Sequence, residues 1–172
     1  MAKYPQKERA DKMSVQAVRK YLDGFGYADR ISEFAESTAT VELAAAVVGV
    51  IPARIAKTLS FKVAESVILI VAAGDAKIDN RKYKDKFGAK AKMLTAQEAI
   101  DLVGHPVGGV CPFAVNEGVK VYLDSSMKRF ETVFPAAGSA GSAVRLTCDE
   151  LFECSQALEW VDVCKIPENE EN

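Results

Sequence analysis

Lys57 is the residue whose type and position most clearly indicate chemistry. In a predicted strand over residues 56–63, Lys57 shares one face with Leu59, Phe61 and Val63, because successive side chains of a strand point to opposite sides. A lysine on an apolar face either extends its ammonium into water or places it in a pocket. In a pocket the ammonium would meet a phosphate group or a developing negative charge.

A loop at residues 104–113, with the sequence GHPVGGVCPF, is the second candidate. It holds three glycines and two prolines in ten residues. Glycine lets the backbone approach a ligand closely and proline restricts the conformation, so the composition indicates a pre-shaped backbone surface. A rigid turn between packed elements explains it equally well, because the GxxxxGK[ST] pattern of a phosphate loop is absent.

The other reactive side chains have no visible activating partner. His105 is the single histidine, and its place in a turn favours a surface or capping residue over a general base. Covalent catalysis by Cys111 or by the serines at 125 and 126 therefore has little support. The four cysteines show no CxxC spacing, so we expect reduced thiols, no metal site and no cofactor.

Composition limits the possible partners. The chain has 172 residues, 49% of them hydrophobic, and a net charge of −2, so we expect one domain and no global basic field for DNA or another long polyanion. Any contact with a nucleic acid must be local. The apolar runs are too short to cross a membrane and the first residues lack the apolar core of a secretory signal, which favours a cytoplasmic protein.

The order of predicted elements mixes hairpins with helices. Helices are predicted over 14–26, 37–50, 80–88, 96–103 and 149–158, two of them starting at the capping boxes Thr95–Glu98 and Thr147–Glu150. Strands are predicted over 30–34, 56–63, 67–74, 89–94, 119–124, 131–138, 142–147 and 159–164. This order predicts an α+β fold with a mixed, mostly antiparallel sheet or partial barrel surrounded by helices.

Five segments in sequence order carry a resemblance to a known family. They are ARIAKTLSFKV, VILIVAAGDAKID, GHPVGGVCPF, VYLDSS and AAGSAGSAVRLT. Together they resemble the YbaK and prolyl-tRNA-synthetase-associated editing domains over about residues 32–163. The resemblance implies a free-standing hydrolase of mischarged tRNA that needs no metal. With it we expect a helical segment of the same domain at 1–30 and the editing domain at 31–165. The residues IPENEEN themselves predict an acidic tail at 166–172.

The resemblance also implies site residues. Lys57 matches the lysine of the family's KTL motif, and Gly108 and Gly109 open its GxxxP loop, so these three are the predicted catalytic residues. The predicted substrate-binding residues are Thr38, Val110, Cys111, Pro112, Asp124, Ser125, Gly138 and Ser139. Members commonly have serine or proline where this chain has Cys111, a departure that bears on the choice of amino acid.

These residues predict an aminoacyl-tRNA deacylase. An aminoacyl ester is already activated, so its hydrolysis needs positioning, a located water and oxyanion stabilisation by backbone N–H groups. The predicted substrate is tRNA for proline carrying a small wrong amino acid such as alanine or cysteine, with the acceptor end and prolyl-tRNA synthetase as partners. The alternatives are a non-catalytic module that binds tRNA ends or a synthetase, and a thiol-dependent hydrolase using Cys111.

Overall fold

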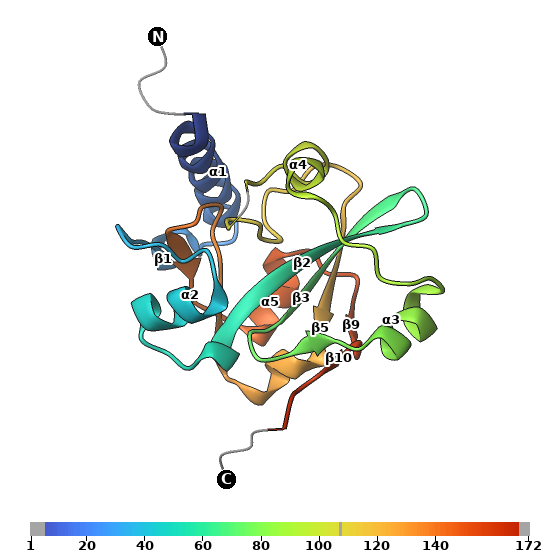
Figure 1. Ribbon diagram of the computed structural model, residues 1–172. Coiled ribbons are helices and arrows are strands. Elements are labelled where there is room, and N and C mark those ends of the chain that lie inside the picture. The colour runs from blue at the N-terminus through green and yellow to red at the C-terminus, as the bar shows by residue number, and fades with distance from the viewer. Residues whose placement is uncertain (1–5, 107, 169–172) are drawn as a thin grey trace.

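A curled, six-stranded mixed sheet forms the centre of the fold in the computed structural model, which describes residues 6–106 and 108–168 (Figure 1). The predictions for residues 1–5, Val107 and 169–172 lie outside the described residues. The strands of this sheet, in spatial order, are β8 (Leu146–Thr147), β6 (Thr132–Pro135), β2 (Ile55–Val63), β3 (Ser66–Ala73), β5 (Lys120–Asp124) and β9 (Glu159–Val161).

Helices and two small sheets surround this centre. The α-helices are α1 (Gln6–Asp23), α2 (Val41–Val48), α3 (Asn80–Phe87), α4 (Ala96–Glu98) and α5 (Cys148–Cys154). A π-helical turn, η3 (Ala99–Val103), continues α4, and 3-10 turns cover Ala28–Arg30, Pro52–Arg54 and Ser125–Arg129. The small antiparallel sheets pair β1 (Ile31–Glu33) with β7 (Ser142–Val144), and β4 (Lys77–Ile78) with β10 (Cys164–Lys165).

The hairpin of β2 and β3 is the longest ladder, with Lys57 opposite Ala72. Strand β3 is buried from Ile68 to Ala73, so its apolar run fills both faces of the sheet, as the sequence predicts for a central strand. Parallel pairing joins β3 to β5, β5 to β9 and β2 to β6, and β6 to β8 is antiparallel. The predicted α+β fold with a mixed sheet is therefore confirmed, but three of the five strand pairings in this sheet are parallel, so it is not mostly antiparallel as predicted.

Local capping signals account for the helix starts. The hydroxyl of Thr40 accepts a hydrogen bond from the backbone N–H of Leu43 at the start of α2, and Gly49 ends this helix in the left-handed conformation. Both predicted capping boxes, at Thr95 and at Thr147, are formed. The predicted start of the first helix at Ser14 is wrong, because α1 begins at Gln6 and the buried Ser14 hydroxyl bonds outside its own helix.

Three predicted strands differ in the structure. The predicted strand 159–164 is divided, since β9 ends at Val161 and pairs with β5 whereas β10 begins at Cys164 and pairs with β4. Residues 89–94 form no strand. Met93 makes an isolated bridge with Phe61, flanked by backbone bonds from Lys62 to Lys92 and from Leu94 to Ser60. Residues 142–147 are divided at Arg145, since β7 pairs with β1 whereas β8 pairs with β6. In these three segments the partner strand, and not the local pattern, decides where pairing stops.

Candidate functional site

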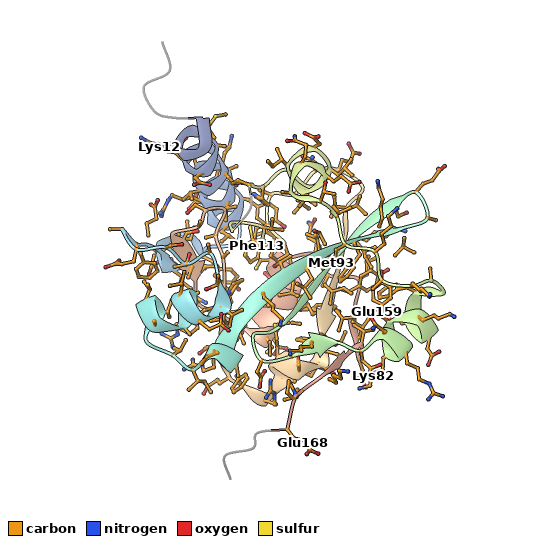
Figure 2. The ribbon with its side chains drawn as sticks, in the orientation of Figure 1. Lys12, Lys82, Met93, Phe113, Glu159 and Glu168 are labelled. Atoms are coloured by element: carbon orange, nitrogen blue, oxygen red, sulfur yellow. The ribbon has the colours of Figure 1, made fainter. Side chains whose placement is uncertain are left out.

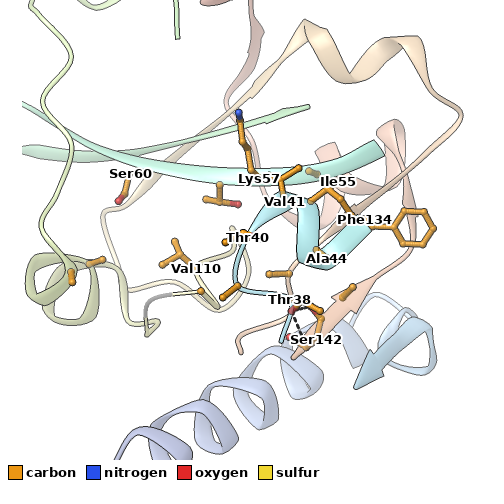
Figure 3. A pocket seen from close by; sticks show the side chains of 18 of the residues that line it. Thr38, Thr40, Val41, Ala44, Ile55, Lys57, Ser60, Val110, Phe134 and Ser142 are labelled. Carbon is orange, nitrogen blue, oxygen red and sulfur yellow. Dashed lines mark hydrogen bonds between the residues drawn. The ribbon is translucent and has the colours of Figure 1, made fainter. Parts of the chain in front are cut away.

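A cavity of about 350 Å³ lies between β2, the start of α2, α4, the glycine loop and the segment from β6 to β7 (Figure 3). Hydroxyl groups supply much of its polar lining, from Thr38, Thr40, Thr58, Ser60, Thr95 and Ser142. Its apolar lining includes Val41, Ala44, Ile55, Leu94, Val110 and Phe134. The described lining residues include no histidine, cysteine or carboxylate side chain. Lys57 is the charged residue among those that line the cavity.

Four of the predicted site residues line this cavity: Thr38, Lys57, Gly108 and Val110. They come from three segments that are distant in the sequence. Thr38 is held by β7, because its hydroxyl accepts a bond of 3.2 Å from the backbone N–H of Ser142 and its own N–H donates to the carbonyl of Ala140 at 2.7 Å. The buried Thr38 therefore fixes the chain that enters α2 against the opposite wall of the cavity.

Lys57 lines the cavity from β2, but its ammonium points away from the cavity side of the strand (Figure 3). It donates to the carbonyl of Gly74 at 3.3 Å and to that of Ala76, both in the loop between β3 and β4. Figure 3 shows the side chain extending to the side of β2 opposite Ser60 and Val110. Burial lowers the pKa of the Lys57 ammonium, partly offset by nearby groups such as Asp75.

The two loop glycines have different environments. Gly108 has φ +84° and lines the cavity, and a Cβ built on it would lie 2.9 Å from Cβ of Ala140. Gly109 is buried behind the cavity wall, and its Cβ would come within 2.6 Å of the backbone of Gly138 and Ser139. Both glycines are required by close approach of other segments, and only Gly108 faces the cavity.

Cys111 and Pro112 are buried and do not line the cavity. Burial raises the pKa of the Cys111 thiol to about 12. A thiol protonated to that degree is a poor nucleophile, so the geometry does not support the thiol-dependent alternative.

Gly138 and Ser139 support the wall from outside. Gly138 has φ +102° and packs against the backbone of Ser14. The backbone N–H of Ser139 donates to the hydroxyl of Ser142 at 3.1 Å, and Ser142 lines the cavity. These predicted residues therefore contact the site through its neighbours.

Asp124 and Ser125 lie elsewhere. The Asp124 carboxylate accepts hydrogen bonds of 2.9 Å from the N–H groups of Ser126 and Val163. With Ser125 it lines a separate cavity of about 380 Å³ that also includes Lys82 and Arg129. The structure does not bring this pair to Lys57, and the bonds of Asp124 tie β5 to the chain that follows β9.

Sequence reasoning missed two groups of residues. The first group is Thr58 and Ser60, which line the cavity. The alternation of side chains in β2 already places them on one face of the strand. The buried Oγ1 of Thr58 has no hydrogen-bond partner among the described residues. The second is His105, predicted to be a surface or capping residue. Its side chain is 1% exposed and bonds to Ser14, 91 positions away, so no local signal could have found it.

The structure bears on a metal site and on a membrane-spanning helix only for residues 6–106 and 108–168. Within them, no three histidine, cysteine or carboxylate side chains come close enough together to hold a metal ion. Among the same residues, no helix has both the length and the apolar composition needed to cross a bilayer.

Comparison with known proteins gives a consistent result. The family model described as "Aminoacyl-tRNA editing domain" matches residues 35–154. The uncharacterized protein YwhH of Bacillus subtilis is 52% identical over 154 residues, covering 89% of this chain and 98% of that protein. A proline–tRNA ligase of Lysinibacillus sphaericus is 31% identical over 59% of this chain, which there spans only 18% of the ligase.

A solved structure has the same fold. It is provisionally described as a trans-editing enzyme for prolyl tRNA synthetase, and it superposes with a TM-score of 0.80 at 27% identity. The match covers 88% of this chain and 97% of that one.

Proposed function

Because this chain belongs to the aminoacyl-tRNA editing domain family, we propose that it is a deacylase that hydrolyses the ester bond of a mischarged tRNA in trans. The observation that carries the proposal is the convergence of Thr38, Lys57, Gly108 and Val110 on one cavity. The proposed location of this activity is the cytoplasm, where it would meet the acceptor end of its substrate.

The lining of the cavity supports hydrolysis without a covalent intermediate. An aminoacyl ester needs a positioned water and stabilisation of the oxyanion more than it needs a strong nucleophile. Since the described lining has no histidine, cysteine or carboxylate, the group that orients the water would be a hydroxyl of the cavity or of the substrate ribose. The N–H of Gly109 already donates to the carbonyl of Pro106, so the N–H groups of Gly108 and Val110 would face the developing oxyanion.

Lys57 would act on the phosphate of the terminal nucleotide. An ammonium has three N–H donors, and two of them already bond to the carbonyls of Gly74 and Ala76. The third would be left for a phosphate that passes β2 on the side of the loop between β3 and β4, away from Ser60 and Val110 (Figure 3). An anionic phosphate would also favour the charged form of an ammonium that burial disfavours.

The proposed substrate is tRNA for proline that carries alanine or cysteine. The relatives that are proline–tRNA ligases support the choice of tRNA. A cavity of about 350 Å³ that must also admit part of the terminal nucleotide leaves room for a small side chain. The aminoacylation site of a synthetase discriminates poorly between small apolar side chains. A separate editing site is useful because it removes such wrong amino acids afterwards.

The test is a deacylation screen. Wild-type protein at limiting concentration is mixed with tRNA for proline charged with alanine, cysteine or proline, and with alanyl-tRNA for alanine as the matched control. We expect release of the free wrong amino acid over several turnovers and little release of proline. Binding without turnover on every substrate would overturn the deacylase proposal in favour of a non-catalytic module that binds tRNA ends.

A further inference from the structure

Both ring nitrogens of His105 are used in the interior of the protein. Nε2 lies 2.6 Å from the carbonyl oxygen of Phe113, and Nδ1 lies 2.5 Å from the hydroxyl oxygen of Ser14 in α1. A carbonyl only accepts, so Nε2 carries the proton and the Ser14 hydroxyl donates to Nδ1. This pattern assigns one tautomer to the neutral ring.

The bond to Phe113 closes the glycine loop at its base. His105 and Phe113 stand on either side of residues 106–112, the segment that contributes Gly108 and Val110 to the cavity. Phe113 lies in the interior near α1, with its ring 6.4 Å from that of Tyr21 (Figure 2). The two ends of the loop are therefore held together and held to the core.

Ser14 also touches the second segment that supports the cavity. A Cβ built on Gly138 would lie 2.7 Å from the carbonyl oxygen of Ser14 and 3.0 Å from its hydroxyl oxygen. Gly138 in turn lies against Gly109. One buried serine thus sits where α1, the glycine loop and the segment after β6 meet.

We propose that Ser14 and His105 are positioning residues of the deacylation site: they fix the glycine loop so that Gly108 and Val110 wall the cavity. This inference rests on the proposed function. It gives α1 a part in the site, although Ser14 precedes the residues 35–154 that match the family model.

A direct acid–base role for His105 does not fit the same geometry. The imidazole is 1% exposed, does not line the cavity, and has both nitrogens engaged. The Cys111 sulfur lies 3.6 Å from Nε2, and burial raises the pKa of that thiol to about 12, so the two do not form a thiolate–imidazolium pair.

The kinetic test uses a double-mutant cycle. Ser14→Ala removes the hydroxyl, and His105→Phe keeps a ring of similar size but removes both hydrogen bonds. We expect Ser14→Ala, which removes one of the two bonds, to lower the saturating single-turnover rate constant about tenfold through misplacement of the loop, and His105→Phe, which removes both, to lower it at least as much. The substrate concentration at half-saturation should stay within about twofold. The double variant should lose little more than His105→Phe alone, because both residues act through one network.

The control is Ser155→Ala, at a second buried serine, whose hydroxyl donates to the carbonyl of Phe152 at the end of α5. Its rate constant should equal that of the wild type. Losses that multiply in the double variant, or a wild-type rate in Ser14→Ala, would overturn the proposal.

Hydrogen exchange gives a second measurement that does not depend on activity. Amides in the peptide 104–113 should exchange faster in Ser14→Ala and His105→Phe than in wild type, and those of β3 should not change. Unchanged exchange in the loop overturns the positioning role. If the wild type hydrolyses no aminoacyl-tRNA, the proposed function fails, and exchange alone decides whether this pair positions the loop.

Discussion

Gly109 lies with its backbone directly against Gly138, so that a Cβ on Gly109 would come within 2.6 Å of the carbonyl carbon and oxygen of Gly138. The contact joins the glycine loop to the segment after β6. Backbone cannot move aside as the end of a flexible side chain can, so this contact leaves no space for any other residue.

Gly109→Ala should therefore cost stability as well as activity. We expect the free energy of unfolding to fall by about 3 kcal/mol, at the upper end of the cost of overpacking. Gly118→Ala is the control for a position without a clash, because no atom lies within 4 Å of its Cβ position. Its positive φ, which Gly109 does not share, should cost about 1 kcal/mol. Equal urea midpoints for the two variants would contradict the packing argument.

Lys57→Ala should remove most deacylase activity and leave the fold intact. Loss of a charge-assisted contact to phosphate corresponds to about 1.5–3 kcal/mol in the transition state. Lys57→Arg should rescue poorly, because a planar guanidinium cannot reproduce the bonds of a compact ammonium to Gly74 and Ala76.

Thermal unfolding and single-turnover hydrolysis are to be measured on the same preparations of these Lys57 variants. A folded alanine variant with wild-type hydrolysis rules out the catalytic role. A badly unfolded one means that the lysine serves the architecture.

Binding of tRNA should depend only weakly on salt. The net charge is −2, and exposed cations such as Lys62, Lys82 and Lys86 are already paired with Glu98, Asp162 and Glu159. We expect log affinity against log salt to have a slope of magnitude below about 3, because each neutralised phosphate contributes about 0.7–0.9. A much steeper slope in a filter-binding titration would indicate extensive contact with the duplex.

The free energy of unfolding should fall as the pH is lowered from about 6.5 to 5, before most carboxylates begin to titrate. Burial lowers the pKa of His105 below its ordinary value of 6.5, so the folded state binds a proton less readily than the unfolded state. This contribution is fully present above pH 6.5 and is lost as pH falls below it, by up to about 1.4 kcal/mol per pH unit. Because His105 is the single histidine, His105→Gln should flatten urea stability between pH 6.5 and 5.

Cys111→Ala should retain most hydrolysis. With a thiol pKa of about 12, roughly one molecule in 10⁵ carries the thiolate at pH 7. The burial that raises this pKa should also protect Cys111 from iodoacetamide in the native state, which peptide mass spectrometry can measure. Inactivation that parallels alkylation of Cys111 would restore the thiol-dependent alternative.

Local chemistry in the sequence predicted much of this structure. The capping boxes at Thr95 and Thr147 formed as predicted, since a hydroxyl, a carboxylate and two backbone N–H groups within four residues suffice to make them. The hairpin of β2 and β3 and the central place of β3 followed from alternation and from a continuous apolar run. The family was predicted from five segments between residues 53 and 147, and the range that the family model matches, 35–154, contains them all.

Tertiary structure decided what the short-range pattern does not contain. Local sequence favoured Ser14 as a helix cap and His105 as a surface residue, yet the two bond to each other across 91 positions in the core. Sequence order also grouped Asp124 with the site, whereas its carboxylate ties β5 to Val163 and lies outside the cavity of Lys57. A polar side chain bonds to whatever group the fold brings within about 3 Å, and that neighbour is set by how distant segments pack.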